Sequence, residues 1–194
     1  MDASITQSWI RIENWLADKA PATFAALEPP ASNAEIRAAE RAVGLEFPAP
    51  LAESLRRHAG TGDAELIPTF SLINPAKISS EWQLMTRIAG RTATADEGSP
   101  GVARDPEDDD HWWHPQWIPI GADGGGDGLV IDQRANGHTG RVGERFKVDG
   151  GVFHRDPAWR SLPALLAHIA HCLETGEKFD GDTAVVEDGL LCWD

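Results

Sequence analysis

A run of glycines and aspartates at residues 121–128 is the first stretch whose composition could do chemistry. Backbone amides in a glycine-rich loop can hold an oxyanion such as phosphate. Phosphate-binding loops lie between a strand and a helix, however, and here a second β-rich run, residues 129–132, follows the glycines. The sequence therefore favours a tight turn, in which the central glycines take positive φ angles and Asp123 or Asp127 accepts backbone hydrogen bonds.

A second group of potential ligands lies in the acidic segment before this run. It comprises Asp105, the acids of residues 107–110, His111 and His114. Carboxylates suit hard cations and imidazoles suit zinc, so a metal-dependent hydrolase is one alternative for this segment. The spacing lacks the alternating acids and central glycine of a calcium loop. A solvated acidic loop is favoured, and its functional version is a surface that faces a partner protein.

Histidines and cysteines near the end of the chain give little sign of catalysis. His168 and His171, three residues apart beside Cys172, could share a helix face and bind zinc, but no HExxH motif is present. A partly buried or surface histidine pair is favoured. No GxSxG elbow occurs, and neither Cys172 nor Cys192 has the local signature of a nucleophile. We therefore expect no enzyme activity, no cofactor and no bound metal.

The net charge of −14, from 31 acidic and 17 basic residues, is concentrated in two segments. Residues 94–111 and residues 174–194 each contain seven acids and one basic residue. Because the basic residues form no cluster, nucleic acid and membrane surfaces are not expected as partners. The chain has two cysteines and no apolar stretch near the ~20 residues that a bilayer requires, so a cytoplasmic location is expected.

Apolar spacing predicts helices in the first half of the chain. One runs from Ile5 to near Pro21, and a second follows a capping box formed by Ser32 and Glu35. Further helices are predicted over residues 48–60 and 75–89. Residues 90–115 lack apolar periodicity and are expected to form a surface loop.

The second half of the chain changes to a β pattern before a closing helix. Short strands are predicted at residues 66–73, 117–120, 129–132, 140–146 and 152–153, and a helix at 162–173. This order predicts an α+β fold with N-terminal helices, a mixed, mostly antiparallel sheet and a C-terminal helix. We expect one domain over residues 1–176 and an acidic tail over residues 177–194.

Several of these segments, in this order, resemble the SUKH superfamily of cell-wall-assembly regulators, killer-toxin resistance proteins and bacterial immunity proteins. The resemblance covers roughly residues 5–176. The segments that carry it are Ile12–Leu16, Leu27–Pro30, Ala34–Ile36, Glu40, Gly44–Pro48, Leu51–Gly60, Trp117–Ile120, Asp123–Asp127, Leu129–Asp132 and the helix from Leu162 to Gly176.

The resemblance implies an α+β fold, no established catalytic residues and a function in protein binding. Bacterial members are linked to polymorphic toxin systems, in which many neutralise a cognate toxin, often a nuclease. By position, Trp117, Asp123, the three central glycines, Asp127 and Asp132 match the hairpin of the family. The acidic loop and the segment after Gly176 depart from the pattern of the family.

From these observations we expect an immunity protein that covers a basic toxin surface with its acidic periphery. A regulatory scaffold of the cell-wall-assembly type is an alternative, and the oligomeric state stays open. Trp112 and Trp113 would anchor the interface if exposed, although a loop that docks back on the body would have the same sequence. The expected partner-binding residues are Asp108, Asp109, Asp110, Trp112, Trp113, Trp117, Asp123 and Asp127, with the neighbouring Glu107 unassigned.

Overall fold

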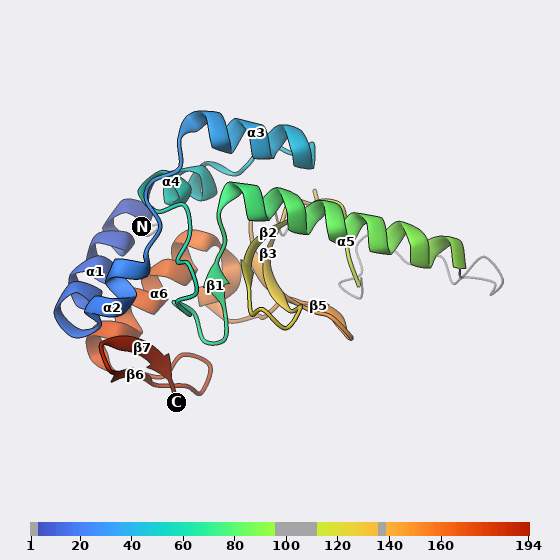
Figure 1. Ribbon diagram of the computed structural model, residues 1–194. Helices are drawn as coiled ribbons and strands as arrows, with labels where there is room; N and C mark the ends of the chain where they lie inside the picture. Colours follow the sequence, from blue (N-terminus) through green and yellow to red (C-terminus); the bar gives the residue numbers. More distant parts are fainter. Residues whose placement is uncertain (1–3, 96–111, 136–138) are drawn as a thin grey trace.

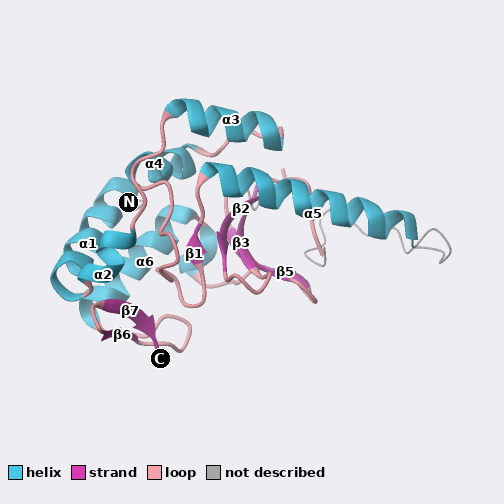
Figure 2. Cartoon of the chain, in the orientation of Figure 1, coloured by secondary structure: helices cyan, strands magenta, loops and turns pink. Residues whose placement is uncertain are grey.

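The structure is a computed structural model that describes residues 4–95, 112–135 and 139–194. Helices gather at one side of the molecule and the main sheet at the other, with one long helix crossing above the sheet (Figures 1 and 2). The helices are α1 Ile5–Lys19, α2 Pro21–Ala26, α3 Asn33–Val43, α4 Ala49–Arg57, α5 Pro75–Ala95, the short 3₁₀ helix η1 Pro157–Arg160, and α6 Leu162–Thr175. The strands are β1 Ser71–Leu72, β2 Trp117–Ala122, β3 Gly128–Asp132, β4 Val142–Phe146, β5 Gly150–Val152, β6 Ala184–Glu187 and β7 Leu190–Trp193.

The helix ends follow the local signals in the sequence. At the start of α3, the Ser32 hydroxyl accepts from the amide of Glu35, and the Glu35 carboxylate accepts from the amide of Ser32, which completes the predicted capping box. Gly44 and Gly176 take left-handed conformations after α3 and α6, where a side chain would be strained. The predicted helix boundaries in these regions are confirmed.

Strands β1 to β5 form one sheet in the order of the sequence, and each pairing between its described strands is antiparallel. Helices precede and follow this sheet, so the predicted α+β class is confirmed. Along β2 and β3, side chains alternate between two faces. Ile118 and Ile131 pack with α6 in the main core, whereas Trp117 and Val130 belong to a second cluster with Met85 of α5.

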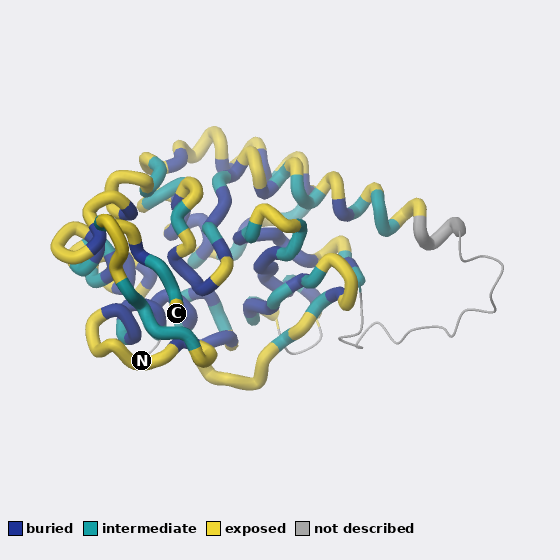
Figure 3. The backbone as a smooth tube through the Cα atoms, turned by 60° about the horizontal axis from the view of Figure 1, so that its bottom comes forward, coloured by how far each residue is buried: buried dark blue, intermediate teal, exposed yellow. Residues whose placement is uncertain are grey.

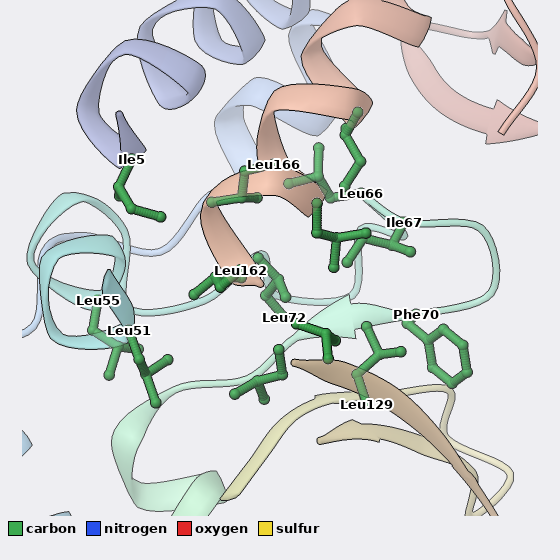
Figure 4. Close-up of a cluster of buried hydrophobic side chains, with 14 of the residues drawn as sticks. Ile5, Leu51, Leu55, Leu66, Ile67, Phe70, Leu72, Leu129, Leu162 and Leu166 are labelled. Atoms are coloured by element: carbon green, nitrogen blue, oxygen red, sulfur yellow. The ribbon is translucent and has the colours of Figure 1, made fainter. Parts of the chain in front are cut away.

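The main core lies between the helical layer and the sheet. Figure 4 shows Leu162 and Leu166 of α6 in one cluster of buried side chains with Leu72 of β1 and Leu129 of β3. All four side chains are buried, and the same cluster extends to Ile5 of α1. Such burial is worth roughly 1.5–3 kcal/mol for each large aliphatic side chain, so this cluster fixes the sheet against α6.

Helix α5 is longer than predicted, since it continues through Gly90 to Ala95, where a loop was expected from residue 90. A Cβ added at Gly90 would have no neighbouring atom within 4 Å, so no close contact requires glycine there. Gly90 therefore destabilises the helix by the intrinsic ~1 kcal/mol of a glycine relative to alanine. Ile88 and Ala89 pack beside the second cluster and hold this part of the helix. Figure 3 shows buried positions recurring along the inner side of α5.

The segment expected as an acidic tail instead folds as a hairpin of β6 and β7. Asp188 and Gly189 form its two-residue turn, both with positive φ. The hairpin packs on α2, where the Leu191 amide donates to the Thr23 hydroxyl and the Ala22 amide donates to the Gly189 carbonyl. No helix in the described part of the chain is long and apolar enough to cross a membrane.

Candidate functional site

The turn between β2 and β3 is closed by its own aspartate. Oδ1 of Asp123 accepts hydrogen bonds from the amides of Gly125, Gly126 and Asp127 at 2.7, 2.9 and 2.9 Å. Gly124 and Gly126 have positive φ, as the turn requires. The amides that a phosphate would need are therefore occupied by a carboxylate, and the predicted turn, with Asp123 as acceptor, is confirmed.

Strand β4 and the residue after it secure the other side of this turn. Oδ1 of Asp127 accepts from the Lys147 amide at 2.7 Å, and the Arg145 guanidinium donates to the Gly126 carbonyl. Arg145 is buried and faces Glu81 of α5 at 3.9 Å. Burial lowers the pKa of Arg145, while Glu81 and the two aspartates of the turn oppose that effect. The turn is thus held by internal hydrogen bonds and charges.

At the other end of β3, Asp132 is completely buried between two arginines. Its carboxylate accepts from Nε and a terminal nitrogen of Arg134, and from Nε and a terminal nitrogen of Arg141, all at 2.8–3.2 Å. Burial would raise the pKa of Asp132, but hydrogen bonds and charge from Arg134, with Arg141, hold it below its usual value. Asp132 therefore acts inside the fold rather than at its surface.

Tryptophans join the end of the acidic segment to the body of the protein. Trp117 packs edge-on against Trp113, with ring centroids 6.0 Å apart, and against Phe153 at 5.5 Å. The Trp113 indole nitrogen donates to the Thr86 hydroxyl of α5, and that of Trp112 donates to the Lys147 carbonyl. This segment docks back on α5 and the sheet, which is the second of the two alternatives for the tryptophan pair.

Burial corrects part of the predicted contact set. Trp117 is fully buried and Trp113 is 7% exposed, so a partner protein cannot reach either ring without unfolding this region. Trp112 is half-buried and keeps part of its surface open. Asp123 and Asp127 retain partial exposure, although each already accepts backbone hydrogen bonds. Asp108, Asp109 and Asp110 lie outside the described residues.

An acidic groove of about 440 Å³ lies next to the β2–β3 turn. Five parts of the fold form its walls. They are the connection between α2 and α3, the loop at residues 60–65, β1, the first turn of α5 and the β2–β3 turn. Four carboxylates and one ammonium line it: Glu28, Asp63, Glu65, Asp123 and Lys77. We name these five side chains and the space between them the acidic groove.

Close backbone contacts fix the walls of the acidic groove. The buried Thr61 hydroxyl accepts from the Leu72 amide of β1 at 2.9 Å and donates to the Ala64 carbonyl at 2.7 Å. A Cβ at Gly60 would lie 2.8 Å from the Leu72 carbonyl oxygen, so only glycine allows this approach. These contacts hold Asp63 and Glu65, both exposed, at the rim.

The first turn of α5 positions Glu28 inside the groove. Asn74 accepts from the Lys77 amide at the start of α5, and its side-chain nitrogen donates to both Glu28 carboxylate oxygens at 3.1 and 3.3 Å. A negative charge at a helix N-terminus is stabilised by the helix dipole. The groove thus presents an excess of three negative charges in a concave site, an arrangement that suits a lysine or arginine side chain.

The predicted histidine and cysteine group does not converge on one point. Nε2 of His168 lies 3.7 Å from the Cys172 sulfur, and His168 stacks on Phe179, but His171 faces Glu177 at 3.2 Å. Burial raises the pKa of the Cys172 thiol, with Glu177 and Asp180 acting in the same direction. Within the described ranges, no three histidine, cysteine or carboxylate side chains form a group that could hold a metal.

Of the other predicted metal ligands, the structure describes only His114. His114 is described, and its Nδ1 accepts from the Gln116 amide at 3.0 Å. Asp105, residues 107–110 and His111 lie outside the described residues. The hypothesis of a metal-dependent hydrolase therefore stays a hypothesis.

Three carboxylates of the acidic groove were missed by the sequence analysis: Glu28, Asp63 and Glu65. They come from separate segments, each with one or two acids, and no local motif joins them. The only signal was the pair of glycines, Gly60 and Gly62, which mark a close backbone approach. The groove exists because the fold brings these segments to the β2–β3 turn.

Comparisons with known proteins agree with this architecture. The model of the SMI1 / KNR4 family (SUKH-1) matches residues 30–167, which extend from the start of α3 into α6. A relative described as a KNR4/SMI1 homolog from Eremothecium gossypii is 36% identical over 58 residues. That match covers 30% of this chain and 9% of the relative, so the chain corresponds to a small part of that protein's length.

Proposed function

The chain belongs to the SMI1 / KNR4 family (SUKH-1), and from this premise we propose that it is a protein-binding module of the immunity type. Its partner is a toxin or other protein with a basic surface, which the acidic face of this chain covers. The fold alone does not select this function, since one fold serves many functions. The proposal is carried by the acidic groove, where four carboxylates surround a concave site beside one lysine.

The carboxylates of the β2–β3 hairpin are bonded within the protein, whereas those at the rim of the acidic groove are exposed. The carboxylates of Asp123, Asp127 and Asp132 hold the hairpin through backbone amides and arginines. By contrast, Asp63 and Glu65 are exposed at the groove rim. An exposed carboxylate attracts a cation from a distance of about one Debye length, ~10 Å at 0.1 M salt. The rim therefore supports fast association with a basic surface.

The test compares two charge-matched variants of the full chain. Asp63→Asn with Glu65→Gln removes two charges from the groove, and Asp18→Asn with Glu46→Gln removes two exposed charges elsewhere. A partner captured on the immobilised chain would be identified and purified. Its association rate with each variant would then be measured by surface plasmon resonance across a series of salt concentrations.

We expect the groove variant to associate about tenfold more slowly at low salt, and the control variant to remain within about twofold of the natural chain. The difference should shrink as salt is added. For the immunity role, the natural chain should also suppress the toxicity of the partner in cells that produce both. Equal association rates for the two variants would contradict the role of the acidic groove. A partner without toxicity would contradict the immunity role.

A further inference from the structure

The β6–β7 hairpin lies outside the region that matches the family, yet it is firmly attached to the body. Leu191 is buried in the main core, and Phe179, also buried, lies within 6.2 Å of the Trp193 ring. The Trp193 indole nitrogen donates to the Glu65 carbonyl at 3.0 Å. Since Glu65 lines the acidic groove, the hairpin lies beside one wall of the groove.

One edge of this two-stranded sheet is occupied by α2. The Gly189 carbonyl accepts from the Ala22 amide, and the Leu191 amide donates to the Thr23 hydroxyl. These bonds cover the side of β7 that faces away from β6. They leave β6 as the outer strand of the hairpin, as Figure 1 also shows.

The register shows which groups of β6 point outward. Thr183 and Asp194 exchange both backbone hydrogen bonds, at 2.7 and 3.0 Å, and Ala184 pairs with Trp193 next to them. In an antiparallel pair, hydrogen-bonded and non-hydrogen-bonded pairs alternate. The backbone groups of Ala184 and Val186 therefore point away from β7. Within the described residues, these backbone groups of Ala184 and Val186 form no hydrogen bond.

Charge around β6 limits what can pair with this edge. Asp182 precedes the strand, and Glu187 and Asp188 follow its apolar centre. A second copy pairing antiparallel about Val185 would place Asp182 of one copy opposite Asp188 of the other. Like charges directly opposite each other in a sheet are destabilising, and natural edge strands use charge in this way to prevent self-association.

We propose that the β6 edge binds an extended segment of a basic protein partner as an added antiparallel strand. Backbone bonds to Ala184 and Val186 would supply affinity, and lysine or arginine at both ends of the segment would face Asp182 and Glu187. Val186, 41% exposed, offers an apolar contact at the centre. This inference rests on the proposed function, because it names a second contact for the same partner, adjacent to the acidic groove.

The first test uses the full chain and a short peptide with alternating valine and threonine at its centre and lysines at both ends. A control peptide keeps the lysines and has proline at the central positions, so it cannot form a strand. The readout is amide hydrogen exchange by NMR. With the first peptide in excess, exchange at Ala184 and Val186 should slow by about tenfold, while the proline peptide should have no effect.

A variant of the chain separates backbone pairing from charge attraction. Val186→Pro removes an amide that points outward, a position where an edge strand tolerates proline. It should abolish the protection by the peptide, and Val186→Thr, which keeps the amide, should retain it. Continued exchange protection of Val185 and Leu191 would show that the hairpin is intact in both variants.

Three results would overturn the proposal: equal effects of the two peptides, unchanged peptide binding by Val186→Pro, or formation of a dimer through β6. The captured partner separates this proposal from the proposed function. If Val186→Pro binds that partner normally and the groove variant does not, the edge is not used but the groove is. If the reverse holds, the edge proposal stands and the groove is not the binding site.

Discussion

The β2–β3 and β6–β7 hairpins both turn on aspartate and glycine, but they use their polar groups differently. In the first, Asp123 takes three amide hydrogen bonds and Asp132 takes two arginines. In the second, Asp188 takes a positive φ angle in the turn, and its side chain is exposed. The carboxylates of the first hairpin are bonded to groups of the protein, whereas the carboxylate of Asp188 in the second hairpin faces solvent.

This difference shows why acidic residues cannot be counted as one binding surface. A carboxylate that already satisfies internal donors contributes stability and little attraction to a partner. An exposed carboxylate contributes little stability and can steer an encounter. The same chemical change made at an aspartate of each hairpin therefore separates a contribution to stability from a contribution to binding.

The largest expected effect is that of Asp132→Asn. The variant removes the buried carboxylate charge that the guanidinium groups of Arg134 and Arg141 both contact, and breaking a buried ion pair costs about 3–5 kcal/mol. The free energy of unfolding, measured in urea, should fall by that amount. The control Asp188→Asn makes the same chemical change in the exposed turn and should remain within about 0.5 kcal/mol. Similar losses in both variants would remove the distinction between the hairpins.

Acid should weaken the same network. The pKa of Asp132 is lowered in the folded protein, because the bonds to Arg134 and Arg141 outweigh the effect of burial. Its stabilising contribution is therefore complete above the unfolded pKa, near ~3.9, and is lost as pH falls through the lower folded value. Urea unfolding of the natural chain and Asp132→Asn at a series of pH values should give curves that converge in acid. Curves that stay parallel would show that another group controls acid stability.

The sequence predicted the features that depend on neighbours along the chain. The capping box of Ser32 and Glu35, the stop at Gly44 and the Asp123 turn each need only a few consecutive residues. The hairpin of β6 and β7 also had a local signal, since Asp188–Gly189 follows Val185–Glu187 and precedes Leu190–Leu191. The high acidity of the segment concealed it, because a charged segment at the end of a chain is usually solvated.

Features that join distant residues could not be predicted in the same way. Arg141 lies nine positions from Asp132 and reaches its carboxylate only because β4 pairs with β3. The acidic groove likewise brings together Glu28 and Asp123, which lie far apart in the sequence. Trp117 alternates with Ile118, and both faces of β2 are covered, so the strand pattern did not show that its ring is inaccessible.

A smaller loss of stability is expected where β5 packs against the Trp117 ring. A Cβ added at Gly151 would lie 2.4 Å from the Trp117 ring, so Gly151→Ala must displace the ring or β5. Overpacking of this kind costs about 1–3 kcal/mol. Gly90→Ala, at a helical position with open space, should instead stabilise the chain by about 0.4–1 kcal/mol. Thermal unfolding followed by tryptophan fluorescence measures both, and no loss in Gly151→Ala would mean that the ring moves freely.

A loss smaller than that of Gly151→Ala is expected at the Asp123 turn. Asp123→Ala leaves three amides to water at a partly exposed turn, a loss of about 1 kcal/mol. Asp123→Asn keeps an acceptor oxygen in the same place and should recover most of this loss. Because it also removes a charge, it tests whether the groove needs that charge for binding. If Asp123→Asn is stable and associates with a basic partner as fast as the natural chain, Asp123 serves the turn alone and the exposed rim carries the attraction.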